Sequence, residues 1–225
     1  MSQPDTLALH PPLPYEEFVN WTTHAFGFVL AVAAGATVVV FAAFHGTAAA
    51  VAGCCVYAAS LAFIYAASTA YHVSVDPATK QFFHVVDRCG IYLLISGTYL
   101  PFTLGPLYGA AGFAISGVVW AITAGGIAKE IFLPMRYREI PVVVYLAQGW
   151  LGLFAFPLLM GVIPHEGILW LFAGGVSYTL GVAFFAWERL PYNHAVWHLF
   201  VLGGSAAHFL AVLCSLGFST GLLSR

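Results

Sequence analysis

The stretch NHAVWHLFVLGGSAAHFLAVLCSLGF, residues 193–218, has two histidines at the start of a long apolar segment. His194 and His198 are four positions apart, so on a helix both side chains lie on one face, one turn apart. The segment is long enough to cross a bilayer. Imidazoles are costly inside a membrane unless they bind something, and a metal ion is the first candidate.

The rest of the chain has the composition of an integral membrane protein. Hydrophobic residues make up 61% of the 225 residues and charged residues 7%, whereas roughly a quarter of a soluble domain is charged. The seven Lys and Arg residues are too few and too scattered for a phosphate-binding face, which argues against nucleic acid as a partner. Residues 1–20 lack Lys and Arg and contain no apolar run, so we do not expect a signal peptide.

Hydropathy and helix-breaking residues predict an all-α fold, a bundle of seven transmembrane helices. The predicted spans are residues 22–44, 48–72, 84–104, 107–128, 141–163, 167–187 and 195–218. We expect a cytoplasmic segment over 1–21, a single membrane domain over 22–218 and a short outer tail over 219–225. Short connections predict that consecutive helices are neighbours, and Pro101 and Pro157 are expected to kink their helices.

The distribution of positive charge predicts the direction of insertion. Most basic residues fall on the side shared by the N-terminus and the even-numbered loops; they are Lys80, Arg88, Lys129, Arg136, Arg138 and Arg189. The opposite side carries only Arg225, so the positive-inside rule predicts a cytoplasmic N-terminus and an outer C-terminus. We expect Arg88 to extend to the interface or to pair with a lipid phosphate.

Polar residues collect at the cytoplasmic ends of four predicted spans. They are Glu17, Asn20 and His24 in the first span, Ser68 and His72 in the second, His84 and Asp87 in the third, and His194 and His198 in the seventh. Spacings of three and four residues put the members of each group on one helix face. Their common depth favours a shared site, although contacts with lipid headgroups or helix ends remain the alternative for each residue alone.

Three neutral imidazoles with one open position are typical of a catalytic zinc ion. His194 and His198 can bind one ion from a single helix, and His72 is the best candidate for the third ligand. Ser68 could hydrogen-bond a ligand or a water molecule. Asp87 could orient that water or act as a general base.

The remaining histidines are weaker candidates. His84 is a possible spare ligand but fits better as an interface residue. His208 lies roughly 15 Å deeper along the helix than the histidine pair, where it either lines a pocket beneath the metal or is an ordinary hydrogen-bonded core histidine. His45 and His165 fall on the outer side and are not expected to join the site.

Glycine and cysteine positions have structural interpretations. The glycine pairs at 125–126, 174–175 and 203–204 predict close packing between helices. The cysteines all lie in apolar segments without CxxC spacing, so we expect small buried residues and no disulfide framework; they are Cys54, Cys55, Cys89 and Cys214.

Two other classes of seven-helix protein fit poorly. A retinal pigment needs a lysine inside the bundle, whereas Lys80 and Lys129 both fall in predicted cytoplasmic loops. A channel needs a polar stripe across the membrane, and the fourth to sixth spans show none.

The ordered set of motifs resembles the hemolysin III family, the bacterial branch of the progestin and adipoQ receptor family, over nearly the whole chain. The motifs are Glu17-x-x-Asn20-x-x-x-His24, Ser68-x-x-x-His72, Asp87 followed by Gly90-Ile91-Tyr92 and Gly97-Thr98-Tyr99-x-Pro101, and His194-x-x-x-His198. The resemblance implies a seven-helix bundle with a zinc ion near the cytoplasmic side of a bacterial inner or plasma membrane. It implies His72, His194 and His198 as zinc ligands, with Ser68 and Asp87 as the conserved serine and aspartate.

The resemblance also implies a wider group of membrane hydrolases that includes the alkaline ceramidases. Our leading hypothesis is therefore a zinc-dependent hydrolase of a lipid amide or ester that uses a metal-activated water. Residues expected around the ligands or in the pocket are Glu17, Asn20, His24, His84 and His208. The alternative is a non-catalytic membrane-lipid homeostasis or sensor protein with structural zinc. A cytolysin is less favoured, because this chain has no soluble state from which to insert. A membrane lipid is the expected substrate or ligand.

Overall fold

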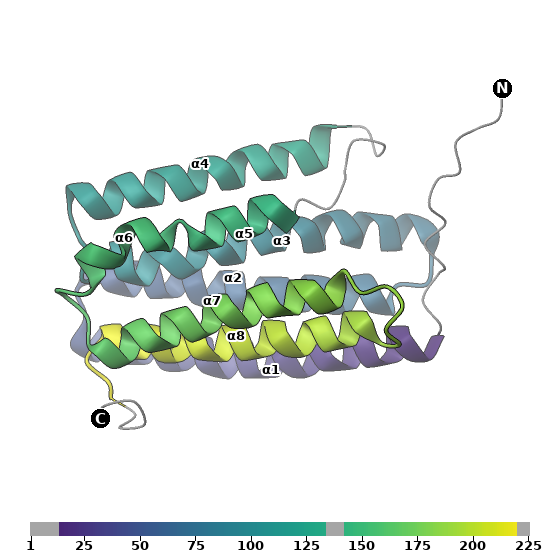
Figure 1. Cartoon of the computed structure of the whole chain (residues 1–225), viewed down its shortest axis with the longest axis horizontal. Helices are drawn as coiled ribbons and strands as arrows, with labels where there is room; N and C mark the ends of the chain where they lie inside the picture. The colour runs from purple at the N-terminus through teal and green to yellow at the C-terminus, as the bar shows by residue number, and fades with distance from the viewer. Residues whose placement is uncertain (1–13, 134–141, 220–225) are drawn as a thin grey trace.

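The computed structural model describes residues 14–133 and 142–219, and every regular element in these two ranges is an α-helix. In chain order the helices are α1 (Pro14–His45), α2 (Ala48–Val73), α3 (Pro77–Thr103), α4 (Ala110–Phe132), α5 (Val142–Trp150), α6 (Gly152–Leu159), α7 (His165–Phe185) and α8 (Asn193–Ser215). The helices lie side by side along the long axis of the molecule (Figure 1). The predicted all-α class is confirmed.

Within the described residues, six helical segments are long and apolar enough to cross a membrane. They are Tyr15–His45, Ala48–Val73, Ala110–Phe132, Val142–Leu159, His165–Phe185 and Asn193–Ser215. Helix α3 has 27 residues but is more polar than these segments and is not among the six. The chain is therefore a multi-span membrane protein in which six of the seven predicted spans meet this criterion.

Helix α3 begins at Pro77, earlier than the predicted start of the third span at residue 84. Asp76 explains the difference, because its carboxylate accepts a hydrogen bond from the Thr79 backbone N–H at 2.8 Å and caps the helix. Proline suits the first helical position, where no N–H donor is needed. The bonds from Thr79 lower the pKa of the Asp76 carboxyl below its usual value.

Pro101 and Pro157 both remain inside helices, in α3 and α6. The helical segment that contains Pro157 is instead divided at Leu151, between α5 and α6. The Tyr99 hydroxyl of α3 lies 2.8 Å from the carbonyl oxygens of residues 148–149, which precede the break. A side chain from a neighbouring helix thus satisfies carbonyl groups that the broken helix leaves exposed.

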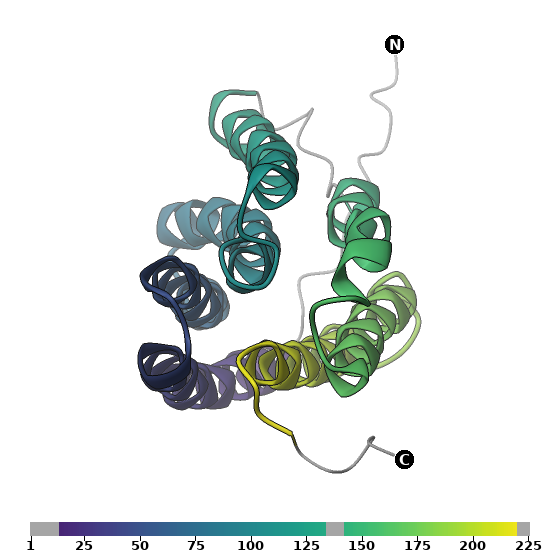
Figure 2. The same ribbon diagram turned by 90° about the vertical axis from the view of Figure 1, so that its left-hand side faces the viewer.

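An end-on view shows the helices arranged around the bundle in a partial ring (Figure 2). Helices α1 to α4 pack in chain order, α7 packs on α8, and α5 contacts both α3 and α7. Helix α8 also packs on α1, so the last helix of the chain returns to the first. Helix α1 therefore contacts both α2 and α8 and can provide partners for side chains of either helix.

The predicted close packing at the glycine pairs is tightest at one member of each pair. A methyl group at Gly126 would clash with the ring of Tyr92, and one at Gly174 would clash with the ring of His208. At Gly204 the nearest atom of Tyr178 would lie 2.7 Å from the added carbon. These glycines leave room for large side chains of neighbouring helices.

A buried polar layer joins α3, α4 and α5. The Arg88 guanidinium and the Glu130 carboxylate form an ion pair with two contacts of 3.0 Å. The Gln148 amide nitrogen donates to Thr123 Oγ1 at 2.8 Å and to Ser96 Oγ at 3.0 Å. Polar groups inside a membrane bundle need protein partners, and these contacts supply them while holding the three helices together.

The expectation that Arg88 would extend to the interface was wrong. Its residue is only 6% exposed, and Glu130 is fully buried. The prediction failed because α4 continues to Phe132, beyond the predicted end of its span at 128, and so brings Glu130 inside the bundle. Arg88 is therefore a buried structural residue. It is no longer one of the basic residues that indicate a cytoplasmic N-terminus.

We predict that Gly126→Ala lowers the melting temperature of the detergent-solubilised protein, since overpacking costs about 1–3 kcal/mol. Gly125→Ala is the matched control, because nothing lies within 4 Å of an added methyl group there. The control should be neutral or slightly stabilising, since alanine favours helix by up to about 1 kcal/mol over glycine. Equal melting temperatures for the two variants would contradict the close contact with Tyr92.

We also predict that Glu130→Leu strongly destabilises the protein, because it leaves the Arg88 charge buried without its carboxylate. Breaking a buried pair in this way costs about 3–5 kcal/mol. The double variant Arg88→Met/Glu130→Leu should recover most of the lost melting temperature. Glu188→Leu, at an exposed position, is the control, and a similar effect of both single substitutions would refute the buried pair.

Candidate metal site

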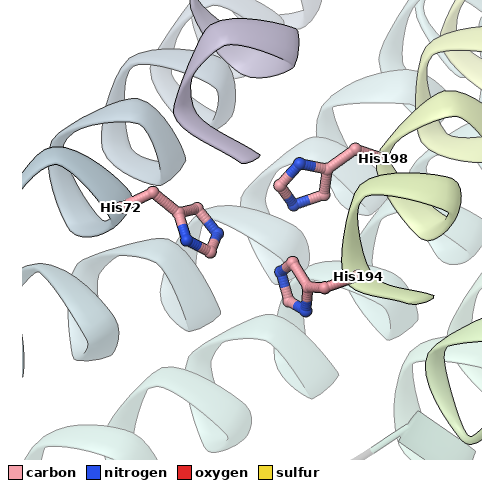
Figure 3. A group of neighbouring side chains, drawn as sticks. All are labelled: His72, His194 and His198. Atoms are coloured by element: carbon pink, nitrogen blue, oxygen red, sulfur yellow. The ribbon is translucent and has the colours of Figure 1, made fainter. Parts of the chain in front are cut away.

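The ends of α2 and α8 bring three histidines together (Figure 3). His72 lies in the last turn of α2, and His194 and His198 lie on successive turns at the start of α8. The side chain of Asn193, the first residue of α8, donates a hydrogen bond to the Phe185 carbonyl oxygen at 3.0 Å. This bond connects the start of α8 to the end of α7 and fixes where the histidine pair begins.

The geometry of the three rings fits a metal ion. One ring nitrogen from each histidine lies within 4.8 Å of the other two, and the rings converge in Figure 3. Zinc–nitrogen bonds are about 2.0–2.1 Å long, so tetrahedral nitrogen ligands lie about 3.3 Å apart. Small side-chain rotations would close the remaining distance. His72 and His198 are buried, at 6% and 1% exposure, which shields the site from competing water.

Helix α1 orients His72 through Glu17. The Nδ1 atom of His72 lies 2.6 Å from Glu17 Oε2, and a carboxylate can only accept a hydrogen bond. The proton therefore sits on Nδ1, and Nε2 keeps its lone pair. Nε2 of His72 is buried and has no hydrogen-bond partner among the described residues. A carboxylate on one ring nitrogen with the other nitrogen free is the usual arrangement of a metal-binding histidine.

Helix α1 orients His198 in the same way, through Thr23. The Thr23 hydroxyl lies 3.1 Å from His198 Nδ1 and 2.8 Å from the Asn20 carbonyl oxygen. The hydroxyl can therefore donate its proton to the backbone and accept from His198 in the tautomer that is protonated on Nδ1. Nε2 of His198 is then the nitrogen available to a metal, as in His72.

The chain matches a family of known proteins over most of its length. The haemolysin-III related family profile matches residues 14–209. The chain belongs to the haemolysin-III related family. It is 39% identical to the hemolysin-3 homolog of Bacillus subtilis (strain 168), over 88% of this chain and 93% of that protein. It is 41% identical to hemolysin-3 of Bacillus cereus, over 88% and 90%.

A mammalian relative extends the similarity. The monocyte to macrophage differentiation factor of Homo sapiens is 30% identical over 70% of this chain and 67% of that protein. The resemblance to the haemolysin III branch of the progestin and adipoQ receptor family is therefore confirmed.

Asp87 of α3 and Ser68 of α2 form a hydrogen-bonded pair in this haemolysin-III related protein. Their side chains share a hydrogen bond, in which the Ser68 hydroxyl donates to the Asp87 carboxylate. Ser68 is buried and lies one turn before His72 on α2, whereas Asp87 is half-buried on α3. Asp87 is not among the three described residues whose ligand atoms converge.

His24 and Asn20 provide further polar atoms at the site. The His24 ring stacks on the His198 ring with 3.5 Å between the centroids and an angle of 24°. Neither ring nitrogen of His24 has a partner among the described residues, and neither does Oδ1 of Asn20. Both residues are buried, at 4% and 2% exposure. Unpaired buried polar atoms are costly, so they identify a place where a polar ligand or water would be stabilised.

The other histidines lie outside the group of three. His84 is half-buried, with its ring centroid 5.0 Å from that of Tyr71. Nε2 of His208 lies 3.2 Å from the Leu171 carbonyl oxygen, which matches the alternative of a hydrogen-bonded core histidine. His45 ends α1 and His165 begins α7; both are exposed.

Thr23 was missed by the sequence analysis, which considered only the Glu17, Asn20 and His24 face of the first helix. The hydrogen bond from Asn193 to the Phe185 carbonyl oxygen and the contact of Lys80 with Glu17 were missed as well. Thr23 is next to His24 in the sequence, but threonine is common in membrane helices and carries no specific signal. The partner of its hydroxyl is a residue 175 positions away, so only the tertiary structure reveals the contact.

We predict that Thr23→Val lowers the zinc affinity of the purified protein about 10–100-fold, the usual effect of removing a partner that orients a ligand. Valine keeps the shape of threonine but cannot accept the bond from His198. Thr22→Val is the matched control, because the neighbouring Thr22 is exposed and its hydroxyl bonds only to its own helix. Unchanged zinc affinity in Thr23→Val, measured by competition with a chelating dye, would contradict this role.

Proposed function

We propose that this haemolysin-III related protein is a zinc-dependent hydrolase that acts on an amide or ester of a membrane lipid. The observation that carries the proposal is the convergence of His72, His194 and His198, with Nδ1 of two of the rings in contact with side chains of α1. Three imidazoles leave one coordination position open, which distinguishes catalytic from structural zinc sites. Zinc in such a site polarises a carbonyl group and makes water acidic enough to react near neutral pH.

The remaining residues of the site have roles that follow from their contacts. The Asp87 carboxylate can take a proton from the attacking water and return it to the leaving group, as a general base and acid. Ser68 orients that carboxylate through its hydroxyl. The unpaired atoms of Asn20 and His24 can hydrogen-bond the polar part of the lipid next to the reacting group.

We further propose that α3 also crosses the membrane, which gives seven spans in total. On this proposal the N-terminus lies in the cytoplasm of a bacterial cell. The polar residues of α3 face protein: Arg88 binds Glu130, Ser96 lies 2.7 Å from Thr123, and Thr103 accepts from Ser116 of α4 at 2.7 Å. Inward-facing polarity of this kind explains the lower hydropathy of α3 without removing it from the membrane. Described basic residues that support the orientation are Lys80, Lys129 and Arg189; Arg136, Arg138 and Arg225 lie outside the described residues.

A structural role for zinc is the second candidate. His72 is on α2, and His194 and His198 are on α8, yet these two helices make few other contacts with each other. An ion bound by all three would add to the direct hydrogen bond from the Tyr65 hydroxyl of α2 to Ser205 Oγ of α8, at 2.9 Å. On this hypothesis the protein contributes to membrane-lipid homeostasis or sensing without catalysis.

The test begins with the metal content of the purified protein. We expect near-stoichiometric zinc in the wild type and in His45→Ala, whose histidine is exposed at the end of α1. His194→Ala should lose most of the zinc. Absence of zinc from the wild type would reject both candidates.

The second stage measures turnover of a panel of lipid amides and esters by the purified protein, with and without a chelator. The hydrolase proposal predicts chelator-sensitive turnover that Asp87→Ala reduces at least 100-fold, in the range that a general base contributes, while zinc content is retained. Zinc-loaded protein that hydrolyses no lipid, together with an Asp87→Ala variant without phenotype, would reject catalysis. If the zinc-loaded protein hydrolyses no lipid and His72→Ala unfolds, the structural role of zinc is favoured.

A further inference from the structure

A chain of charged and polar groups connects the surface of the protein to His72. Lys80 Nζ donates to Glu17 Oε1 at 2.8 Å, and Glu17 Oε2 lies 2.6 Å from His72 Nδ1. The three residues come from the first turn of α3, the start of α1 and the end of α2. One carboxylate is thus shared between a lysine near the surface and a candidate metal ligand.

Lys80 is held in place by more than Glu17. Its Nζ atom lies 4.7 Å from the centroid of the Tyr71 ring and 3.4 Å from the Tyr71 carbonyl oxygen. Its backbone N–H donates to the Asp76 carbonyl oxygen at 2.8 Å in the capped first turn of α3. The Lys80 side chain is 29% exposed and that of Glu17 is 18% exposed. The ammonium group is therefore accessible to water yet has a fixed position.

The contact with Lys80 limits the orientations of Glu17. A carboxylate at a partly exposed helix start can rotate about its side-chain bonds and hydrogen-bond to water. When one oxygen binds Lys80, the other is directed at His72 Nδ1. That bond determines both the tautomer and the ring orientation of His72, and these determine where Nε2 points.

We propose that Lys80 is a positioning residue of the metal site, acting on His72 through Glu17. The inference rests on the proposed binding of zinc by His72, His194 and His198. A positive charge near a cation also repels it, and this effect opposes the positioning effect. The two can be separated by their sign, because removal of the charge alone would tighten zinc binding, whereas loss of the positioning would weaken it. About 1 M salt, with a screening length of about 3 Å, reduces the exposed part of the charge effect.

The test measures zinc affinity by dye competition in 1 M NaCl for the full-length protein. We expect Lys80→Met to bind zinc about 3–10-fold more weakly, a smaller effect than the 10–100-fold expected for a direct partner of a ligand such as Glu17. Lys80→Arg should stay within about twofold of the wild type, since arginine keeps the charge and the donors. Lys129→Met, a lysine on α4, is the control and should bind like the wild type; Lys80→Gln serves as a second neutral variant.

A double-mutant cycle tests the route through Glu17. In a Glu17→Ala background, Lys80→Met should cause no additional loss of affinity, because the carboxylate that connects the two residues is gone. An equal loss in both backgrounds would overturn the proposed route. Wild-type affinity in both Lys80→Met and Lys80→Gln would overturn this inference alone, whereas absence of zinc binding by the wild type would overturn the proposed function as well.

Discussion

The interior of a bilayer supplies no water to a polar group, so each buried donor and acceptor of a membrane protein has to find its partner within the protein. This constraint accounts for the organisation of the bundle. The polar residues of α3, α4 and α5 pair with one another, with the Arg88–Glu130 ion pair and the Gln148 side chain between the helices. Polar residues of α1, α2 and α8 gather at one end of the bundle around the three histidines.

The two clusters differ in their chemistry. In the α3–α4–α5 layer, Arg88 and Glu130 neutralise each other, so the layer is suited to holding helices together. At the histidine cluster, both ring nitrogens of His24 and Nε2 of His72 are buried without partners among the described residues. Oε1 of Gln148 in the other layer is likewise without a partner among the described residues, so the histidine cluster is set apart by the convergence of its ligand nitrogens.

Much of the bundle and of the candidate site could be predicted because both depend on local patterns. Long apolar segments predict membrane helices, and the four-residue spacing of His194 and His198 puts them on one face. Placing His72 beside them needed only the direction of each span. The errors have a common cause: Arg88 was assigned to the interface, and Thr23 was overlooked, because in each case the partner lies on another helix.

The amino-acid pattern alone was sufficient to establish a multi-span helical membrane protein and to select the three histidines, since both follow from hydropathy and helical periodicity. The contacts between helices were visible only in the folded bundle. Only there does α1 lie against both α2 and α8, with Glu17 and Thr23 on the Nδ1 atoms of His72 and His198. The physical reason is that a hydrogen bond between helices depends on their relative rotation and depth, which no single helix encodes.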